Sequence, residues 1–484
     1  MLSTPRIKTA AGPIAALLVM LFADLDPGNP MVTRMAAVAV WMAIWWLTEA
    51  VHLAVTSLVP FIMLPLLGIA PAQEVSAEYM DQVIFLFIGG FLISFAIERW
   101  ELHQRIALRI LTLSGTRPGS ILAGIMITSF LISMWISNTA TVMMLLSAVL
   151  AIVHMTGKNE FAKSNSGFHK AILIGLAYSA TIGGMSTLVG TPPNMVFVRT
   201  FSEAYPDLEG ISFTKWFSFA FPLALVLLIC CYFILRFLFI RNAPDTGVSR
   251  DYFREAYKQL GPMSYEQKYV SLIFAVTALL WFTRADIPFG DITMPGWNRL
   301  FSNPAWITDS TVAITMTLLL FLIPSKTEKG TALLRWSDAV KLPFDIILLF
   351  GSGFALAMGF ESSGLSTWMA GHLSILKGAE PLVLVFSIVA LVCVISEFAS
   401  NVASIQLMLP ILIALQKELG IDPLLLMVPA TLAASLGFML PVATAPNTIV
   451  FGSRKIAVND MAKAGLLMNL AGILLISLFY LLLH

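Results

Sequence analysis

The segment WISNTATVMM, residues 135–144, carries Ser137, Asn138 and Thr139 into a stretch that is otherwise almost wholly apolar. No charged residue occurs between positions 119 and 153. A polar group in a hydrophobic environment is costly unless it has a partner. We therefore predict that these residues form the polar tip of a hairpin of two short helices. An ordinary loop between two spanning helices is the alternative.

The overall composition is that of a membrane protein. Of 484 residues, 58% are hydrophobic and 12% are charged, whereas soluble domains carry about 25% charged residues. We predict an all-α polytopic membrane protein. The net charge of +1 gives no reason to expect nucleic acid as a partner. The three cysteines lie in apolar runs without metal-ligand spacing, so we expect them to serve packing.

Hydrophobic runs bounded by charges or by Pro and Gly predict about eleven transmembrane helices. Two further apolar pairs, 119–155 and 382–417, are predicted to be re-entrant hairpins, although each could instead be two crossings. The predicted crossings are 10–26, 33–50, 52–70, 81–111, 170–200, 212–240, 267–284, 304–324, 342–373, 424–452 and 461–483.

The distribution of Lys and Arg predicts the orientation. With the N-terminus in the cytoplasm, the inner segments hold 22 of the 29 Lys and Arg residues, as the positive-inside rule requires. The outer loops 71–80 and 200–211 carry Glu and Asp but no Lys or Arg. We expect a multi-pass protein of the inner (plasma) membrane, with a cytoplasmic N-terminus and an outer C-terminus.

An internal repeat organises the chain. FIGGF (87–91) recurs as FGSGF (350–354), and SNTA (137–140) recurs as SNVA (400–403), both 263 residues later. An odd number of predicted crossings separates the copies, so the two copies are expected to be inverted, as in secondary transporters. The expected parts are an N-terminal helix (1–32), a first repeat (33–240), a cytoplasmic connector (241–266) and a second repeat (267–484).

Each repeat also contains an interrupted helix. GGMSTLVGTPPN (183–194) lies in the predicted broken helix 170–200, and GFMLPVATAPN (437–447) lies in the predicted broken helix 424–452. Pro and Gly at this density break a helix and free its backbone groups. A simple proline kink is the alternative. Unwound half-helices present amides to anions and carbonyls to cations.

The two tips and two breaks supply hydroxyls, amides and carbonyls, with no Lys, Arg or His among them. Such groups can bind a small hard cation through oxygen. They can also donate to a carboxylate, but nothing in the set neutralises its charge, and a buried dianion without counter-charge is costly. The hypothesis is therefore an anion and Na⁺ bound together.

These motifs, with TEAVHLAVTSLVP (48–60), resemble the divalent anion:sodium symporter (DASS) family, which includes bacterial di- and tricarboxylate transporters. The resemblance covers about residues 35–480. It implies an elevator-type homodimer that imports C4-dicarboxylates such as succinate, malate or fumarate, with two or more Na⁺ sites per protomer. The implied substrate contacts are Ser137, Asn138, Thr139, Thr187, Ser400, Asn401, Thr444 and Ala445. The implied ligands are Ser133, Ser137, Asn138 and Ser186 for the first Na⁺, and Ser396, Ala399, Asn401 and Ala443 for the second.

Three residues depart from the family pattern: Val402 stands where Thr is common, Ala445 where Pro is frequent, and Ser186 where Gly is common. They bear on which anion is preferred. A Na⁺-independent exchanger, or a sulfate or citrate transporter of the same fold, is the alternative. An enzyme is not expected, because HExxH, GxSxG and paired membrane aspartates are missing from the sequence. Glu397, in the second hairpin, is either functional or a structural tether.

Overall fold

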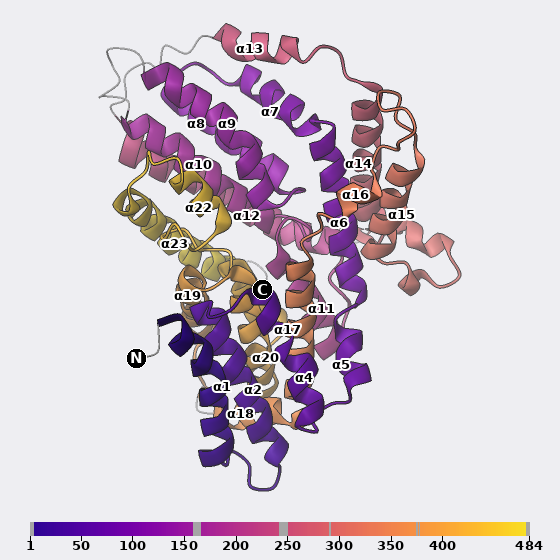
Figure 1. Cartoon of the computed structure of the whole chain (residues 1–484), viewed down its shortest axis with the longest axis vertical. Coiled ribbons are helices and arrows are strands. Elements are labelled where there is room, and N and C mark those ends of the chain that lie inside the picture. The colour runs from indigo at the N-terminus through magenta and orange to yellow at the C-terminus, as the bar shows by residue number, and fades with distance from the viewer. Residues whose placement is uncertain are drawn as a thin grey trace.

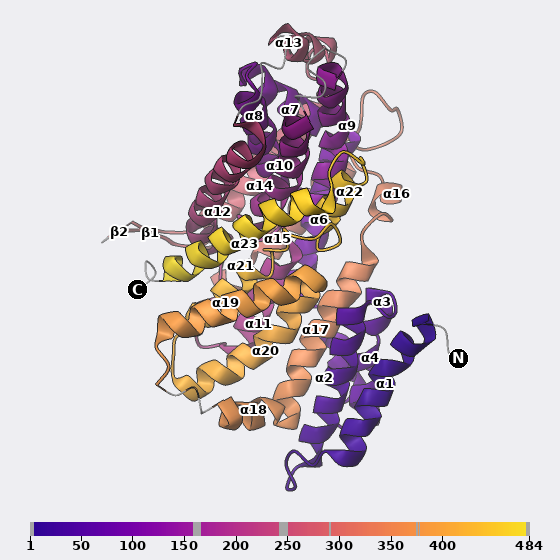
Figure 2. The same cartoon turned by 90° about the vertical axis from the view of Figure 1, so that its left-hand side faces the viewer.

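The computed structural model describes residues 4–157, 166–241, 250–289, 292–373, 376 and 378–480. Helices form most of this part (Figure 1), and the two strands found in it make one short hairpin, β1 (Ile287–Phe289) and β2 (Ile292–Met294) (Figure 2). Within the described residues, eight helices are long and apolar enough to cross a membrane, and five shorter apolar helices accompany them. The expected polytopic helical architecture is therefore confirmed.

The first half of the chain begins with α1 and ends with the connector helix α13. The predicted broken helix 170–200 consists of two helices, α10 and α11, with an unwound segment between them. The elements are α1 (Thr4–Phe22), α2 (Pro30–Thr48), α3 (Leu53–Thr56), α4 (Val59–Leu66), α5 (Ala72–Glu78), α6 (Gln82–Arg99), α7 (Leu102–Leu113), α8 (Pro118–Ser133), α9 (Asn138–Gly157), α10 (Ser166–Met185), α11 (Pro192–Ala204), α12 (Phe213–Leu235), the π-helical turn η1 (Arg236–Ile240) and α13 (Arg250–Gln259).

The second half repeats much of this order. Here α21 and α22 are the two parts of the predicted broken helix 424–452. The elements are α14 (Tyr265–Thr283), β1, β2, the 3₁₀ turns η2 (Trp297–Leu300) and η3 (Pro304–Trp306), α15 (Asp309–Leu322), α16 (Trp336–Ala339), α17 (Phe344–Ser363), α18 (Leu365–Leu373), α19 (Pro381–Phe398), α20 (Asn401–Leu419), α21 (Leu424–Ala433), α22 (Ala445–Phe451) and α23 (Val458–Tyr480).

The 263-residue sequence repeat corresponds to matching helices. The pairs α7 and α18, α8 and α19, and α9 and α20 each begin 263 residues apart, because they start at residues 102 and 365, 118 and 381, and 138 and 401. Both hairpins begin with a proline in the first helical turn, where its missing N–H costs nothing. The hairpin α8–α9 and the hairpin α19–α20 lie in different parts of the molecule (Figure 2).

Two predicted long spans are each divided into two helices, which corrects the sequence prediction. The predicted span 81–111 turns at Glu101, which has φ +53°, and 342–373 turns at Gly364, which has φ +82°. A residue in this left-handed region ends one helix and redirects the chain into the next. The first turn was visible in the sequence, because Glu98, Arg99, Glu101 and Arg105 lie around it, whereas only Glu361 precedes the turn at Gly364.

Both turns are held by an amide side chain from the start of another helix. Gln267 Nε2, in α14, donates to the carbonyl of Trp100 at 3.0 Å. Asn29 Nδ2, the cap of α2, donates to the carbonyl of Ser363 at 2.8 Å. Since Trp100 and Ser363 are 263 residues apart, the repeat extends to the contacts that fix these turns.

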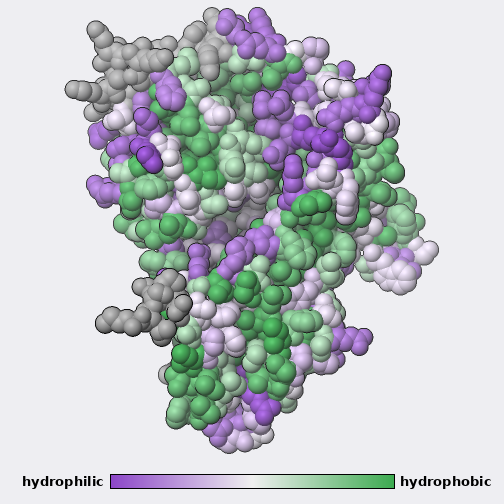
Figure 3. All heavy atoms as spheres, in the orientation of Figure 1, coloured by the Kyte–Doolittle hydropathy of each residue, from purple (hydrophilic) through white to green (hydrophobic). Residues whose placement is uncertain are grey.

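The helix α10 forms the centre of the first-half packing. Its residues 171–185 are all buried, and it packs against α8, α9, α12 and α22. A Cβ at Gly183 would overlap the carbonyl of Phe130, so the glycine permits the close approach of α10 and α8. Figure 3 shows hydrophobic residues over much of one face, with hydrophilic residues gathered at the end that carries α13.

Candidate substrate and sodium site

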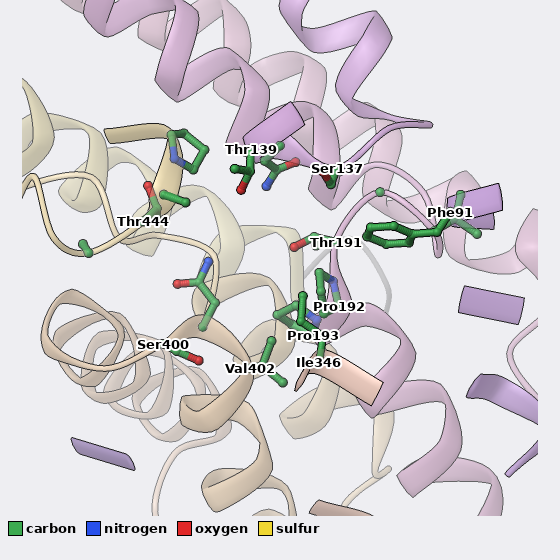
Figure 4. A pocket seen from close by; sticks show the side chains of 17 residues that line it. Phe91, Ser137, Thr139, Thr191, Pro192, Pro193, Ile346, Ser400, Val402 and Thr444 are labelled. Atoms are coloured by element: carbon green, nitrogen blue, oxygen red, sulfur yellow. The ribbon is translucent and has the colours of Figure 1, made fainter. Parts of the chain in front are cut away.

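A cavity of about 200 Å³ lies where the two hairpin tips meet the two helix breaks. In Figure 4, Ser137 and Thr139 approach it from one side and Ser400 and Val402 from the other. Every lining residue is neutral. The lining residues that the sequence predicted as substrate contacts are Ser137, Asn138, Thr139, Ser400, Asn401, Thr444 and Ala445; the predicted sodium ligand Ala443 also lines the cavity.

The two tips have the same local structure. Ser137 Oγ accepts a hydrogen bond from Ala140 N at 3.3 Å, and Ser400 Oγ accepts one from Ala403 N at 3.2 Å. These hydroxyls therefore cap the first turns of α9 and α20, as serine commonly does. Because both helices begin at the cavity, the positive ends of their dipoles face it.

A serine–asparagine pair stands behind each tip. Ser133 Oγ donates to Asn138 Oδ1 at 2.6 Å, and Ser396 Oγ donates to Asn401 Oδ1 at 2.9 Å. Both serines are fully buried. The structure thus brings together the oxygens that the sequence assigned to each sodium site from its hairpin.

Each break is closed by an asparagine that the sequence prediction did not include. Asn194 Nδ2 donates to the carbonyls of Gly184 at 3.2 Å and Thr187 at 2.8 Å. Asn447 Nδ2 donates in the same pattern to the carbonyls of Gly437 and Leu440, both at 3.1 Å. The repeated dipeptide Pro-Asn, which ends both GTPPN and ATAPN, was the signal that could have identified them.

The oxygens at the first break suit a cation. Ser186 Oγ and Asn194 Oδ1 are buried and lack any hydrogen-bond partner. Gly184 is pressed against the Asn138 amide, so that no Cβ fits between them. Buried oxygens without donors are costly unless a ligand satisfies them. A small hard cation coordinated by oxygen would do so, and the residues therefore fit Na⁺.

The second break presents a related set. Ser435 Oγ and Asn447 Oδ1 are buried without a hydrogen-bond partner, and Ser396 Oγ also lies 2.5 Å from the carbonyl of Ala434. Ala399 is buried beside the tip. The predicted ligand Ser396 thus contacts this break and also pairs with Asn401, and these oxygens fit Na⁺.

Thr187 differs from the other predicted substrate contacts, because it does not line the cavity. It is fully buried, and its hydroxyl donates to the carbonyl of Met134 at 2.5 Å and accepts from Gly190 N at 3.1 Å. The first of these bonds connects the break to the first hairpin, and the second closes a turn within the break. Thr187 therefore holds the shape of the break in this structure, and its contact with substrate stays a prediction.

Glu397 is a tether in this structure. Its carboxylate accepts hydrogen bonds from Met439 N at 2.8 Å, Leu440 N at 3.1 Å and Asn469 Nδ2 at 2.6 Å. The residue is 4% exposed and does not line the cavity. Glu397 therefore fixes the second break against its hairpin and against α23.

Phe91 and Ile346 also line the cavity and were not predicted. They come from α6 and α17, the helices that carry the repeated FIGGF and FGSGF motifs. Phe91 is the last residue of its motif, so the motif was an available signal. Ile346 lies in an ordinary apolar run and offered none.

Comparisons with known proteins identify the family. Residues 7–483 match the sequence model of the sodium:sulfate symporter transmembrane region. The chain belongs to this family. It is 39% identical over 473 residues to a sodium-dependent dicarboxylate transporter, SdcS, of Staphylococcus saprophyticus, and 38% identical to SdcS of Staphylococcus aureus. Both alignments cover 96% of this chain and 89% of the relative.

Two solved transporters share the fold. Neisseria gonorrhoeae MtrF superposes with a TM-score of 0.55 at 15% identity, covering 84% of this chain and 83% of its own. Alcanivorax borkumensis YdaH superposes with a TM-score of 0.51 at 12% identity, covering 84% and 85%. The family match and the SdcS relatives, and not these two structures, show that the protein is a multi-pass membrane transporter of the sodium:sulfate symporter family and not an enzyme.

Proposed function

We propose that this protein imports C4-dicarboxylates such as succinate, malate and fumarate together with Na⁺. The observation that carries the proposal is the cavity itself. It offers hydroxyls, amides and two helix N-termini to an anion, and none of its lining residues is charged. A dianion therefore needs a counter-charge that the cavity does not supply.

Sodium would supply that charge from the two sites beside the tips. Asn138 and Asn401 each line the cavity and each pair with a buried serine behind it. One side chain can thus face the substrate and a cation at once. Binding either ligand would orient this side chain for the other, and this shared contact is the physical basis of coupling.

The relatives support the same function, because both SdcS proteins are named sodium-dependent dicarboxylate transporters. We further propose two Na⁺ sites per protomer, inverted repeats and an elevator motion in a homodimer. The approach of the two tips from opposite sides of the cavity supports the inversion. The charge distribution supports a cytoplasmic N-terminus, an outer C-terminus and a location in the plasma membrane.

The test is uptake of labelled succinate into proteoliposomes, with and without an inward Na⁺ gradient. We expect uptake that requires Na⁺ and saturates with both ligands. Equal uptake without Na⁺ would show an exchanger instead. Uptake of sulfate or citrate with no uptake of any C4-dicarboxylate would refute the proposed substrate class.

A further inference from the structure

A second cavity lies where the start of α8, the end of this helix away from the first tip, meets the end of α12. Its volume is about 420 Å³, and its lining includes Arg117, Arg236 and Arg241. No acidic residue lines it within the described part of the chain. Three guanidinium groups that converge on one hollow repel one another unless an anion lies between them.

Local structure directs these arginines to the cavity. The π-helical turn η1 begins with Arg236 and is followed at once by Arg241. The Arg236 guanidinium lies beside Gly119, where an added Cβ would be only 3.1 Å from it. It donates to the Tyr232 hydroxyl at 2.9 Å, and the described acidic side chains make no ion pair with any of the three arginines. Within the described residues, no carboxylate therefore neutralises these three charges.

The start of α8 adds backbone donors to the same cavity. Arg117 stands at its N-cap position and makes no side-chain capping bond, and Gly119 and Ser120 in the first turn line the hollow. The equivalent position 263 residues later is Glu380, whose carboxylate caps α19 by accepting from Val383 N at 3.0 Å. The second hairpin therefore caps its helix end with its own carboxylate, whereas the first has Arg117 there, joined by Arg236 and Arg241 from the end of α12.

An exposed apolar stripe on α12 leads to this cavity. Val226, Ile229, Phe233 and Phe237 follow one another at helical spacing and are 43%, 49%, 61% and 63% exposed. The Arg241 guanidinium lies over the Phe237 ring, 5.5 Å from its centre. The stripe can thus hold hydrocarbon chains while the arginines hold a charged group at their end.

We propose that this cavity binds the headgroup of an acidic phospholipid, with the acyl chains along the α12 stripe. Phosphate is the group that arginines bind best in pairs or clusters. Basic cavities between membrane helices on the cytoplasmic side bind such headgroups. The proposal is independent of the transported substrate and requires only that the protein spans a membrane.

The test uses the full chain in a neutral detergent. Phosphatidylglycerol is titrated against phosphatidylcholine, and the thermal unfolding midpoint and the lipid retained in native mass spectrometry are measured. We expect phosphatidylglycerol to raise the midpoint and to be retained, with little effect of phosphatidylcholine. In R117Q/R236Q/R241Q we expect about fivefold weaker binding for each arginine removed. Equal effects of the two lipids on the parent protein would overturn the proposal.

Matched variants separate charge from fold. R454Q removes one exposed arginine elsewhere on the predicted inner side and should bind phosphatidylglycerol like the parent. R117K/R236K/R241K keeps the charges and should recover most of the binding that the glutamine variant loses. If the glutamine variant binds like R454Q, or if the lysine variant binds no better than the glutamine variant, the arginine site is wrong.

A third arm distinguishes lipid from free anion. V226S/I229S should weaken phosphatidylglycerol binding and leave the response to inorganic phosphate unchanged, because it alters the part of the stripe that has no contact with the arginines. If inorganic phosphate stabilises the parent protein as much as the lipid does, and V226S/I229S binds the lipid normally, the cavity is an anion site and the lipid assignment fails.

Discussion

The two helix breaks have the same backbone arrangement, but different side chains hold them. In the first half, the Thr187 hydroxyl donates to the carbonyl of Met134. In the second half, Glu397 stands where the first half has Met134, and its carboxylate accepts from the amides of Met439 and Leu440. A neutral hydroxyl in one half and a buried carboxylate in the other thus hold equivalent helix breaks in place. The repeat therefore preserves the backbone shape of the break more strictly than the side chains that stabilise it.

The same contrast recurs outside the breaks. Arg34 of α2 donates to the carbonyl of Leu67 at 2.9 Å, after α4. In the second half, Glu266 of α14 accepts from the amides of Lys326 and Thr327, both at 2.9 Å, after α15. Opposite charges therefore fix corresponding loops, because a carbonyl requires a donor and an amide requires an acceptor.

Glu397→Leu should produce the largest loss of stability, because it leaves two backbone amides and the Asn469 amide without an acceptor in a buried place. We expect a cost of about 3 kcal/mol. Thr187→Val removes two neutral hydrogen bonds and should cost about 2 kcal/mol. Thermal unfolding in detergent measures both. Equal costs would show that the two tethers are equivalent after all.

The two tip asparagines should be almost equally important to transport. Asn138→Ala and Asn401→Ala each remove an amide that lines the cavity and pairs with a buried serine. We expect each to lower succinate uptake about a hundredfold, and to raise the Na⁺ concentration needed for half-maximal uptake. The control is Met143→Ala, an exposed position on α9. Normal uptake by both folded asparagine variants would refute the site.

The two hairpins also pack differently against their long helices. A Cβ at Gly353 would overlap the Gln406 amide, which donates to the carbonyl of Leu349 at 2.7 Å. A Cβ at Gly90 would meet Val189 at 3.4 Å, an ordinary contact. Gly353→Ala should therefore destabilise by about 2 kcal/mol through overpacking, and Gly90→Ala by much less. A chemical denaturation series compares them, and equal effects would refute the asymmetry.

Lowering the pH should weaken only one of these two loop contacts, the one that Glu266 makes. Glu266 lies just before the predicted span 267–284. Burial by itself would raise the pKa of its carboxyl group. Hydrogen bonds from Thr327 and Ser325 have the larger effect and hold the pKa at about 2. Its pKa is lowered on folding from 4.5, so its contribution is complete above about pH 4.5 and is lost as the pH falls toward 2. Glu266→Gln should flatten the pH dependence of the unfolding midpoint in this window.

Arg34→Gln is the matched variant for this acid effect. It removes the corresponding contact of the first half, and arginine keeps its charge throughout this pH range. We expect it to lower the unfolding midpoint by a similar amount at every pH. If Arg34→Gln also flattened the pH dependence of the unfolding midpoint, that dependence would not come from Glu266.

The smallest effect is expected at the third position of the tips, where Thr139 corresponds to Val402. Both residues line the cavity. Val402→Thr adds a second hydroxyl, which should strengthen succinate binding by about 1 kcal/mol and lower its KM about fivefold. Uptake kinetics at saturating Na⁺ measure the change. An unchanged KM would place the substrate against the first tip only.

Much of the site could be predicted from local sequence. Ser137, Asn138 and their copies Ser400 and Asn401 are polar residues within apolar runs, and this conflict marks a site wherever it occurs. The Gly and Pro residues of the breaks were equally visible, because they cannot continue a helix. The left-handed conformation of Glu101 could not be predicted, since hydropathy does not report the backbone angle of a residue.

The sequence by itself determined which parts the protein has. These are a membrane-spanning helical chain, a repeated pair of hairpin tips and helix breaks, and neutral polar groups suited to an anion and a cation. These features depend on residue type and spacing. The tertiary structure decided the direction of each side chain. It turned Thr187 toward Met134 and away from the cavity, and it gave Glu397 its three donors. The reason is physical: those partners lie on other helices, and only packing brings them within hydrogen-bond distance.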